Sequence, residues 1–108
     1  MVLDRELAMA RVGGDAELLQ ELAQLFLEEY PRLMEELRAA LEQGDAQLVE
    51  RTAHGLKGSV ANFGAKPAVD AAYQIEQLGR GGKLGPVAEV LRSLDLALLS
   101  LHGELAQL

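Results

Sequence analysis

The sequence contains no cysteine and no tryptophan among its 108 residues, and few other aromatic side chains. The absence of cysteine excludes disulfide bridges, thiolate metal sites and thiol nucleophiles. Aromatic residues make up only 4% of the chain while leucine and alanine are abundant, and this composition favours helices over sheets. The length fits one domain spanning residues 1–108 and leaves no room for a second core.

Basic residues are also scarce. The chain has 10 lysines and arginines but 17 aspartates and glutamates, which gives a formal net charge of −7. This charge repels nucleic acid backbones and anionic membrane surfaces, so neither is an expected partner. The chain has no run of about 18 apolar residues, and its start, Met1 to Glu6, lacks the basic and apolar stretches of a secretory signal. We therefore expect a soluble, cytoplasmic protein.

Glycine and proline divide the chain into five segments with helical periodicity. The predicted helices run roughly from Asp4 to Arg11, Asp15 to Gly44, Asp45 to Phe63, Lys66 to Leu78, and Gly85 to Leu108. Asp15 and Asp45 each follow a glycine and are suited to cap the next helix. Pro31 lies inside the second segment, but the apolar stripe keeps its phase across it, which predicts one long helix with a kink.

The apolar positions of these segments predict which faces are buried. In the first helix these are Leu3, Leu7 and Ala10; in the second they are Leu18, Leu22, Leu25, Phe26, Tyr30, Leu33, Leu37 and Leu41. The last helix carries a seam with alternating spacings of three and four: Leu84, Val87, Leu91, Leu94, Leu98, Leu101, Leu105 and Leu108. Leu96 and Leu99 widen that stripe, which favours a bundle wall over the alternative of a dimeric coiled coil. The prediction is an all-α fold, an antiparallel four-helix bundle with an additional short N-terminal helix, in a monomer.

His54 is the candidate reactive residue. At about 100° per residue, the apolar side chains of its helix share one arc and His54 lies almost opposite, facing solvent. Its neighbours within two turns are Gln47, Glu50, Arg51, Lys57, Gly58 and Ala61. Gly55 and Gly58 lie within the helix, where each costs roughly 0.5 to 1 kcal/mol relative to alanine. Because Gly58 is on the exposed face, we expect something from outside to approach closely there.

Several chemistries can be weighed for an exposed histidine. A single imidazole without a second histidine at helical spacing offers too few ligands for a metal. Hydrolysis needs an oxyanion hole and a pocket that excludes water, and His54 has neither. Acting alone, the imidazole can attack a phosphoryl group that another protein presents together with its metal. His102, the only other histidine, lies beside the leucine seam and is assigned no role.

Residues 54–64, HGLKGSVANFG, resemble the signature of histidine-containing phosphotransfer (HPt) domains, H-x-L-K-G-x-x-x-x-[LF]-G, with every fixed position filled. Residues 13–15, 26–31 and 44–45 are also similar to the family's pattern, so the resemblance covers nearly the whole chain. It implies a four-helix bundle with an extra N-terminal helix. It also implies that His54 accepts a phosphoryl group on Nε2 from a receiver aspartate and passes it to another receiver.

The resemblance implies roles for other residues. Lys57 would offset phosphoryl charge, and Gly58 would leave room for the receiver's aspartate and metal. Glu76 would orient the His54 ring by a hydrogen bond, with an ordinary surface carboxylate as the competing interpretation. The remaining exposed neighbours of His54 form the expected docking face: Gln47, Glu50, Arg51 and Ala61. The chain itself would bind no cofactor and no metal, since Mg²⁺ would come from the receiver.

The implied partners are receiver domains of response regulators, of a hybrid sensor kinase, or of both. The chain would be a stoichiometric carrier without autokinase activity, because it has no room for a nucleotide-binding domain. The alternative is a helical docking or dimerisation module that carries no phosphate. The start at residues 2–4 suits a domain excised from a hybrid kinase, although a free-standing protein remains the other possibility.

Overall fold

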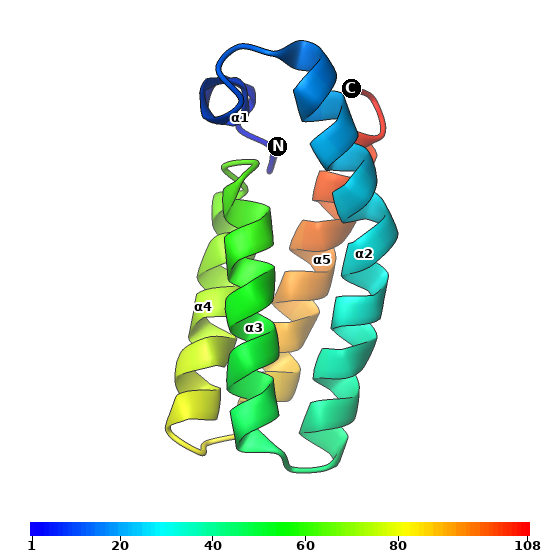
Figure 1. Ribbon diagram of the computed structural model, residues 1–108. Coiled ribbons are helices and arrows are strands. Elements are labelled where there is room, and N and C mark those ends of the chain that lie inside the picture. The colour runs from blue at the N-terminus through cyan, green and yellow to red at the C-terminus, as the bar shows by residue number, and fades with distance from the viewer.

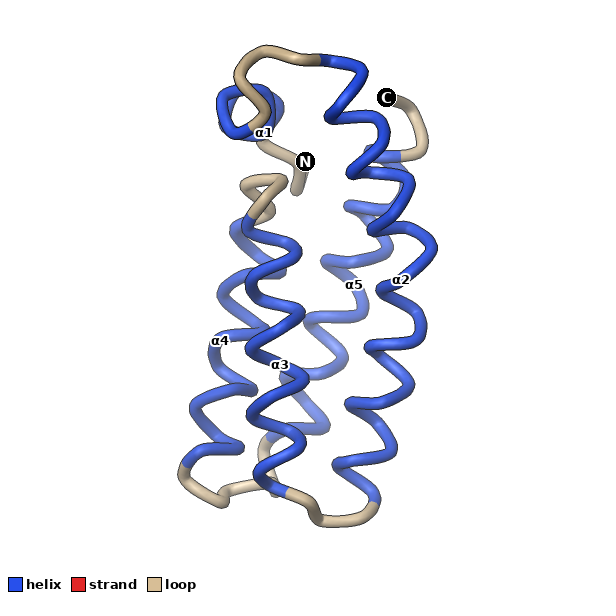
Figure 2. The backbone as a smooth tube through the Cα atoms, in the orientation of Figure 1, coloured by secondary structure: helices blue, strands red, loops and turns tan.

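The computed structural model describes residues 1–108 and contains five helices and no strands (Figure 1). The helices are α1 (Arg5–Arg11), α2 (Ala16–Glu42), α3 (Ala46–Ala61), α4 (Lys66–Arg80) and α5 (Val87–Leu105). The helices α2 to α5 run up and down alternately, and α1 crosses one end of this bundle, next to the loop that follows α3 (Figure 2). The predicted four-helix bundle with an additional N-terminal helix is confirmed.

Local sequence signals explain where the helices begin and end. Asp4, Asp15 and Asp45 precede α1, α2 and α3, and each carboxylate accepts the backbone N–H three residues later at 3.0 to 3.1 Å. Gly44 adopts a φ of 68°, which lets the chain reverse between α2 and α3. The helix α2 continues through Pro31, as expected. The helix α4 extends beyond the predicted Leu78 to Arg80.

A single apolar core of 25 buried residues runs through the molecule. The buried residues of α5 supply a large share of it: Val87, Leu91, Leu94, Ala97, Leu98, Leu101 and Leu105. The expectation that Leu96 and Leu99 widen this buried stripe was wrong, because they are 68% and 67% exposed. Leu99 is rotated by about 100° around the helix from Leu98, away from the strip that faces the neighbouring helices. None of the helices combines the length and hydrophobicity needed to cross a membrane.

Two other predicted faces need correction. In α1, Ala8 is buried whereas Leu7 and Ala10 are exposed, because this short helix crosses the bundle end rather than lying along it. In α2, Leu18 and Leu25 are exposed. The residues that α2 buries are Leu19, Ala23, Phe26, Met34, Leu37 and Ala40. The prediction chose leucines and omitted alanines, but the line of α2 that packs on its neighbours includes two alanines, Ala23 and Ala40, beside larger side chains.

Candidate functional site

His54 lies in the middle of α3 with its ring on the outside of the bundle, and its side chain is 67% exposed. The surface beside it is bare. A Cβ placed on Gly55 or Gly58 would meet no atom within 4 Å, so packing within the chain does not require glycine at either position. The structure therefore presents an exposed imidazole beside a stretch of uncovered backbone.

Glu76 reaches this ring from the neighbouring helix α4. Its carboxylate Oε2 lies 2.8 Å from His54 Nδ1, and the residue is only 3% exposed. An ionised carboxylate can only accept hydrogen bonds, so Nδ1 carries the proton and donates. In the neutral ring, Nε2 then keeps its lone pair, because only one ring nitrogen is protonated. The possibility that Glu76 is an ordinary surface carboxylate is excluded by its burial.

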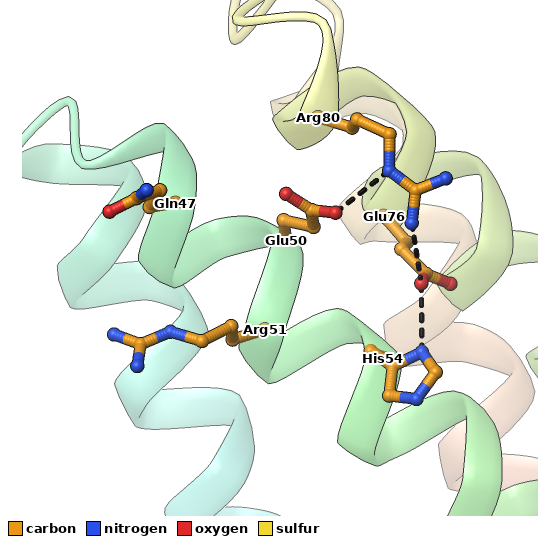
Figure 3. Close-up of a pocket in the computed structure, with 6 residues that line it drawn as sticks. All are labelled: Gln47, Glu50, Arg51, His54, Glu76 and Arg80. Carbon is orange, nitrogen blue, oxygen red and sulfur yellow. Dashed lines mark hydrogen bonds and ion pairs between the residues drawn. The ribbon is translucent and has the colours of Figure 1, made fainter.

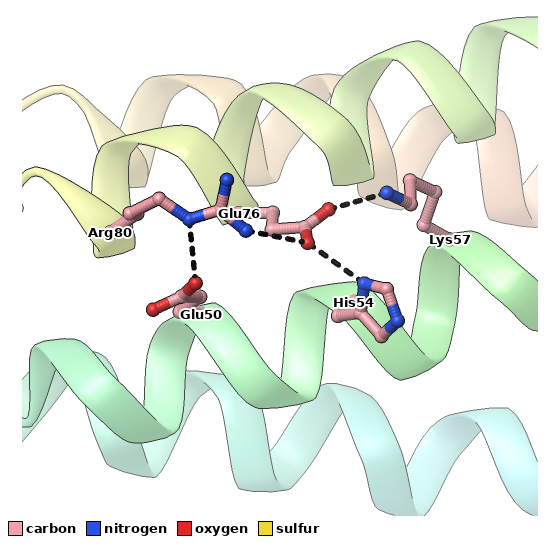
Figure 4. A network of polar contacts seen from close by, with 5 residues as sticks. All are labelled: Glu50, His54, Lys57, Glu76 and Arg80. Atoms are coloured by element: carbon pink, nitrogen blue, oxygen red, sulfur yellow. Dashed lines mark hydrogen bonds and ion pairs between the residues drawn. The ribbon is translucent and has the colours of Figure 1, made fainter.

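Lys57 makes the second contact with Glu76. Its Nζ lies 2.7 Å from Oε1 (Figure 4). The same nitrogen lies over the ring of Tyr73, 5.1 Å from the ring centroid. The hydrogen bond from Lys57 holds the pKa of Glu76 below its ordinary value. Burial acts in the opposite direction, and the hydrogen bond from His54 adds to the lowering. The positive charge of Lys57 is thus bound to a carboxylate that itself contacts the His54 ring.

Arg80, which the sequence analysis did not single out, completes the network. Its Nε donates to Glu50 Oε2 at 2.8 Å, and its NH2 nitrogen lies 3.5 Å from Glu76 Oε2 (Figure 4). The spacing of four residues from Glu76 was the available signal, since it places Arg80 on the same face of α4. The pairing with Glu50 requires α3 and α4 to be adjacent, which local periodicity does not reveal.

These side chains line an open groove between α3 and α4 (Figure 3). Its lining consists of Gln47, Glu50, Arg51, His54, Glu76 and Arg80. Three of the four residues expected to form the docking face therefore lie together with His54, whereas Ala61 lies two turns further along α3, outside the groove. No three His, Asp or Glu side chains in the structure are grouped so that they could hold a metal ion.

A second, apolar groove lies on the other side of α3, against α2. It is lined by Leu22, Leu25, Phe26, Glu29, Leu33, Ser59, Asn62 and Phe63. Asn62 follows Gly58 by four residues and so lies on the same side of the helix, and this groove therefore borders the bare surface next to His54. The sequence analysis missed it because it placed the leucines of α2 in the core.

His102 lies away from both grooves, on α5. Its Nδ1 is 2.7 Å from the Tyr30 hydroxyl, and the two rings meet edge to face. Burial and the nearby charge of Asp95 raise the pKa of Tyr30, so the hydroxyl stays protonated. This contact joins α5 to α2, and it gives His102 a place in the packing of the bundle.

The chain is similar to known proteins both in sequence and in fold. Residues 21–108 match the family described as the Hpt domain. Histidine-containing phosphotransfer protein B (HptB) from Pseudomonas aeruginosa PAO1 superposes with a TM-score of 0.91 at 24% identity, covering 98% of this chain and 92% of that one. The HPT domain of a sensor hybrid histidine kinase from Shewanella gives 0.79 at 23% identity, covering 99% and 96%. At these identities the two structures show a common fold. A search of curated proteins gave no match.

Proposed function

Because this chain belongs to the Hpt domain family, we propose that it carries a phosphoryl group on His54 between receiver domains of a two-component phosphorelay. The observation that supports this most is the state of the His54 ring. Its Nδ1 is held by the buried Glu76 carboxylate while its exposed side chain leaves Nε2 open to solvent. A nucleophile with its lone pair oriented outward is suited to a phosphoryl group that arrives on another protein.

The proposed transfer is a single displacement at phosphorus. The lone pair of Nε2 forms a bond to phosphorus, and the bond from phosphorus to the receiver's aspartate oxygen breaks and leaves a carboxylate. The ring keeps its proton on Nδ1 and becomes a phosphoimidazolium cation. Glu76, 2.8 Å away, stabilises this positive charge. Transfer to the next receiver is the reverse of these steps.

We propose that the chain acts as a stoichiometric carrier and not as a kinase. His54 lies in mid-helix, and the groove around it is open. The receiver would supply Mg²⁺ and the electrostatic stabilisation that phosphoryl transfer needs. This chain would contribute the nucleophile, its orientation and the surface on which the receiver sits.

The receiver would dock over α3, with Gly58 at the centre of the contact. On one side it would meet the polar groove of Gln47, Glu50 and Arg51, and on the other the apolar groove around Leu25. Leu25 is 58% exposed, whereas Leu19 and Leu37 of the same helix are buried in the core. A polar and an apolar surface flanking the reactive side chain is the anatomy of a transient protein interface.

The test is phosphoryl transfer from a receiver domain labelled with ³²P in the presence of Mg²⁺. The chain should acquire a label that acid removes and base does not, as expected of a phosphoramidate. His54→Gln should abolish labelling with unchanged helicity, since the side chain faces solvent, and the matched variant His102→Gln should label normally. Undiminished labelling of His54→Gln would disprove the assignment. A folded wild-type chain that binds receivers but never becomes labelled would favour the docking module instead.

A further inference from the structure

Gly79 lies inside α4, although its backbone does not require glycine. It is buried, it is helical, and it is not among the glycines with positive φ. Glycine is among the least favourable residues in a helix interior, so neither local conformation nor helix propensity explains its presence. The explanation has to come from what packs against this position.

The contact at Gly79 is with the backbone of α3. A Cβ at this position would lie 2.8 Å from the Glu50 amide nitrogen and 3.1 Å from both the Ala46 carbonyl oxygen and Glu50 Cα. Ordinary van der Waals contact to a Cβ begins at about 3.4 Å, and backbone atoms within a helix cannot rotate aside. Any side chain at position 79 would therefore push α4 away from the first turns of α3.

The same two helices carry the His54 network. Glu76 lies one turn before Gly79 in α4, and His54 lies one turn after Glu50 in α3. The separation of the helices at Gly79 therefore sets how far the Glu76 carboxylate must reach. That carboxylate already spans to His54 Nδ1 at 2.8 Å and to Lys57 Nζ at 2.7 Å, which are ordinary hydrogen-bonding distances.

Arg80 closes the same crossing from the solvent side. It is the residue after Gly79, and its bond to Glu50 at 2.8 Å ties α4 to the very residue whose backbone Gly79 touches. Two features therefore hold α3 and α4 close together: Gly79 has no side chain to separate them in the interior, and the Arg80–Glu50 ion pair joins them at the surface.

We propose that Gly79 is a positioning residue for the chemistry of His54. By letting α4 lie directly on the backbone of α3, it brings Glu76 within hydrogen-bonding distance of Nδ1 and so keeps the proton there and the lone pair on Nε2. The inference rests on the proposed function only in taking Nε2 as the reacting atom. Gly79 itself touches neither the phosphoryl group nor the receiver.

The experiment compares Gly79→Ala with the matched variant Gly103→Ala. Both replace a helical glycine by alanine, but a Cβ at Gly103 meets nothing within 4 Å. The first measurement is the tautomer of the His54 ring, read from its ¹⁵N NMR shifts. The second is the rate at which potassium phosphoramidate phosphorylates His54, a reaction in which Nε2 displaces ammonia from phosphorus and no receiver takes part.

We expect Gly79→Ala to shift the His54 ring from the Nδ1–H form towards a mixture with the Nε2–H form. Its phosphorylation should slow by roughly tenfold, because a displacement of about 1 Å at a reacting group is enough for an effect of this size. Gly103→Ala should match the wild type in both measurements. In a Glu76→Ala background, Gly79→Ala should cause no further slowing, since it acts through Glu76.

Wild-type tautomer and rate in Gly79→Ala would overturn the proposal, and so would equal slowing with and without Glu76. If Gly79→Ala does not fold, Glu76→Asp poses the same question by withdrawing the carboxylate by one methylene. Loss of the Nδ1–H form in that variant supports the proposal. Its retention would show that the proton stays on Nδ1 even when the carboxylate is further away, and this would refute the proposal. Phosphorylation by phosphoramidate but by no receiver would contradict the proposed function and leave the role of Gly79 intact.

Discussion

Glu76 is an acidic side chain in a buried position, and its partners account for its charge. Burial alone would favour the neutral carboxyl group. The contacts with Lys57 and His54 reverse this and lower the pKa of Glu76. The network therefore has two consequences: it fixes the His54 ring, and it links the stability of the fold to pH.

The first prediction concerns acid stability. Since the folded-state pKa of Glu76 lies below its ordinary value of 4.5, the unfolded chain binds the proton first as pH falls. The stabilisation is fully present well above pH 4.5 and is lost as pH falls through the folded-state pKa. In Glu76→Gln, the drop in unfolding free energy between pH 7 and pH 3, measured with urea, should be smaller than in the wild type.

Glu35→Gln is the control for this measurement, because Glu35 is exposed in the middle of α2, away from the helix ends, and takes part in none of the ion pairs of the structure. It should show the full wild-type drop between the two pH values. An equal drop in Glu76→Gln and in the wild type would mean that the Glu76 network contributes nothing to the pH dependence of folding.

The second prediction concerns Gly58, where a substitution should change the rate of phosphoryl transfer and leave the stability of the fold unchanged. A Cβ at Gly58 meets nothing within 4 Å, so Gly58→Glu should keep a thermal midpoint close to that of the wild type. The glutamate would project beside His54, adding bulk and a negative charge where the phosphoryl group arrives. Transfer from a receiver should slow tenfold or more, equivalent to about 1.4 kcal/mol of barrier.

Gly103→Glu, on α5, controls for the added charge and should transfer at the wild-type rate. The thermal midpoint and the transfer rate of Gly58→Glu are therefore measured on the same preparation. If Gly58→Glu unfolded at ambient temperature while its folded fraction transferred normally, Gly58 would serve internal packing and the docking face would lie elsewhere.

At the scale of whole elements, the segment before α1 is held by the last helix. The Glu104 carboxylate on α5 accepts the backbone N–H of Val2 at 3.1 Å and that of Leu3 at 2.6 Å. The Asp4 amide donates to the Phe63 carbonyl at 3.0 Å. These bonds tie the chain to the ends of α3 and α5, and they explain why α1 crosses the bundle end.

Replacing Glu104 by alanine should release this segment. Two part-buried amides would lose a charged acceptor, and we expect the unfolding free energy to fall by about 1 to 2 kcal/mol. Hydrogen exchange at the Leu3 amide should accelerate, while labelling of His54 stays at the wild-type level. Gln107→Ala, an exposed change on the same terminus, should alter neither quantity. Unchanged protection of Leu3 in Glu104→Ala would contradict this account of how α1 is held.

The sequence predicts the individual helices better than it predicts the contacts between them. Glycine and proline positions, aspartate caps and the 3.6-residue period predicted all five helices, and the phase of residues 45–63 predicted the exposure of His54. The period misplaced Leu18, Leu25 and Leu96, because burial in a bundle depends on how closely helices approach as well as on hydrophobicity. The contact of Glu76 and the role of Arg80 depend on the spacing of two helices, which no local pattern contains.

At the scale of the whole molecule, the bundle is a rod of 41 × 20 × 20 Å with one core along its length. The His54 network lies on the long side of this rod, partway along α3, whereas α1 and both chain ends lie at one tip (Figure 1). A partner that covers the site therefore approaches across the helix axes and meets α3 together with its neighbours.

The same architecture predicts a monomer. The central leucines of the α5 seam lie in the core, since Leu98 is 1% exposed and Leu101 is 0% exposed, so they are not available for a coiled coil between two chains. The exposed Leu96 and Leu99 form a patch far smaller than the roughly 800 Å² per partner of a stable interface. The net charge of −7 also opposes self-association. Light scattering at micromolar concentration should give the monomer mass of 11.6 kDa, unchanged when Leu96 and Leu99 are both replaced by glutamine. A dimer that dissociates in this double variant, with helicity intact, would instead show that the outer face of α5 is an interface between two copies of the chain.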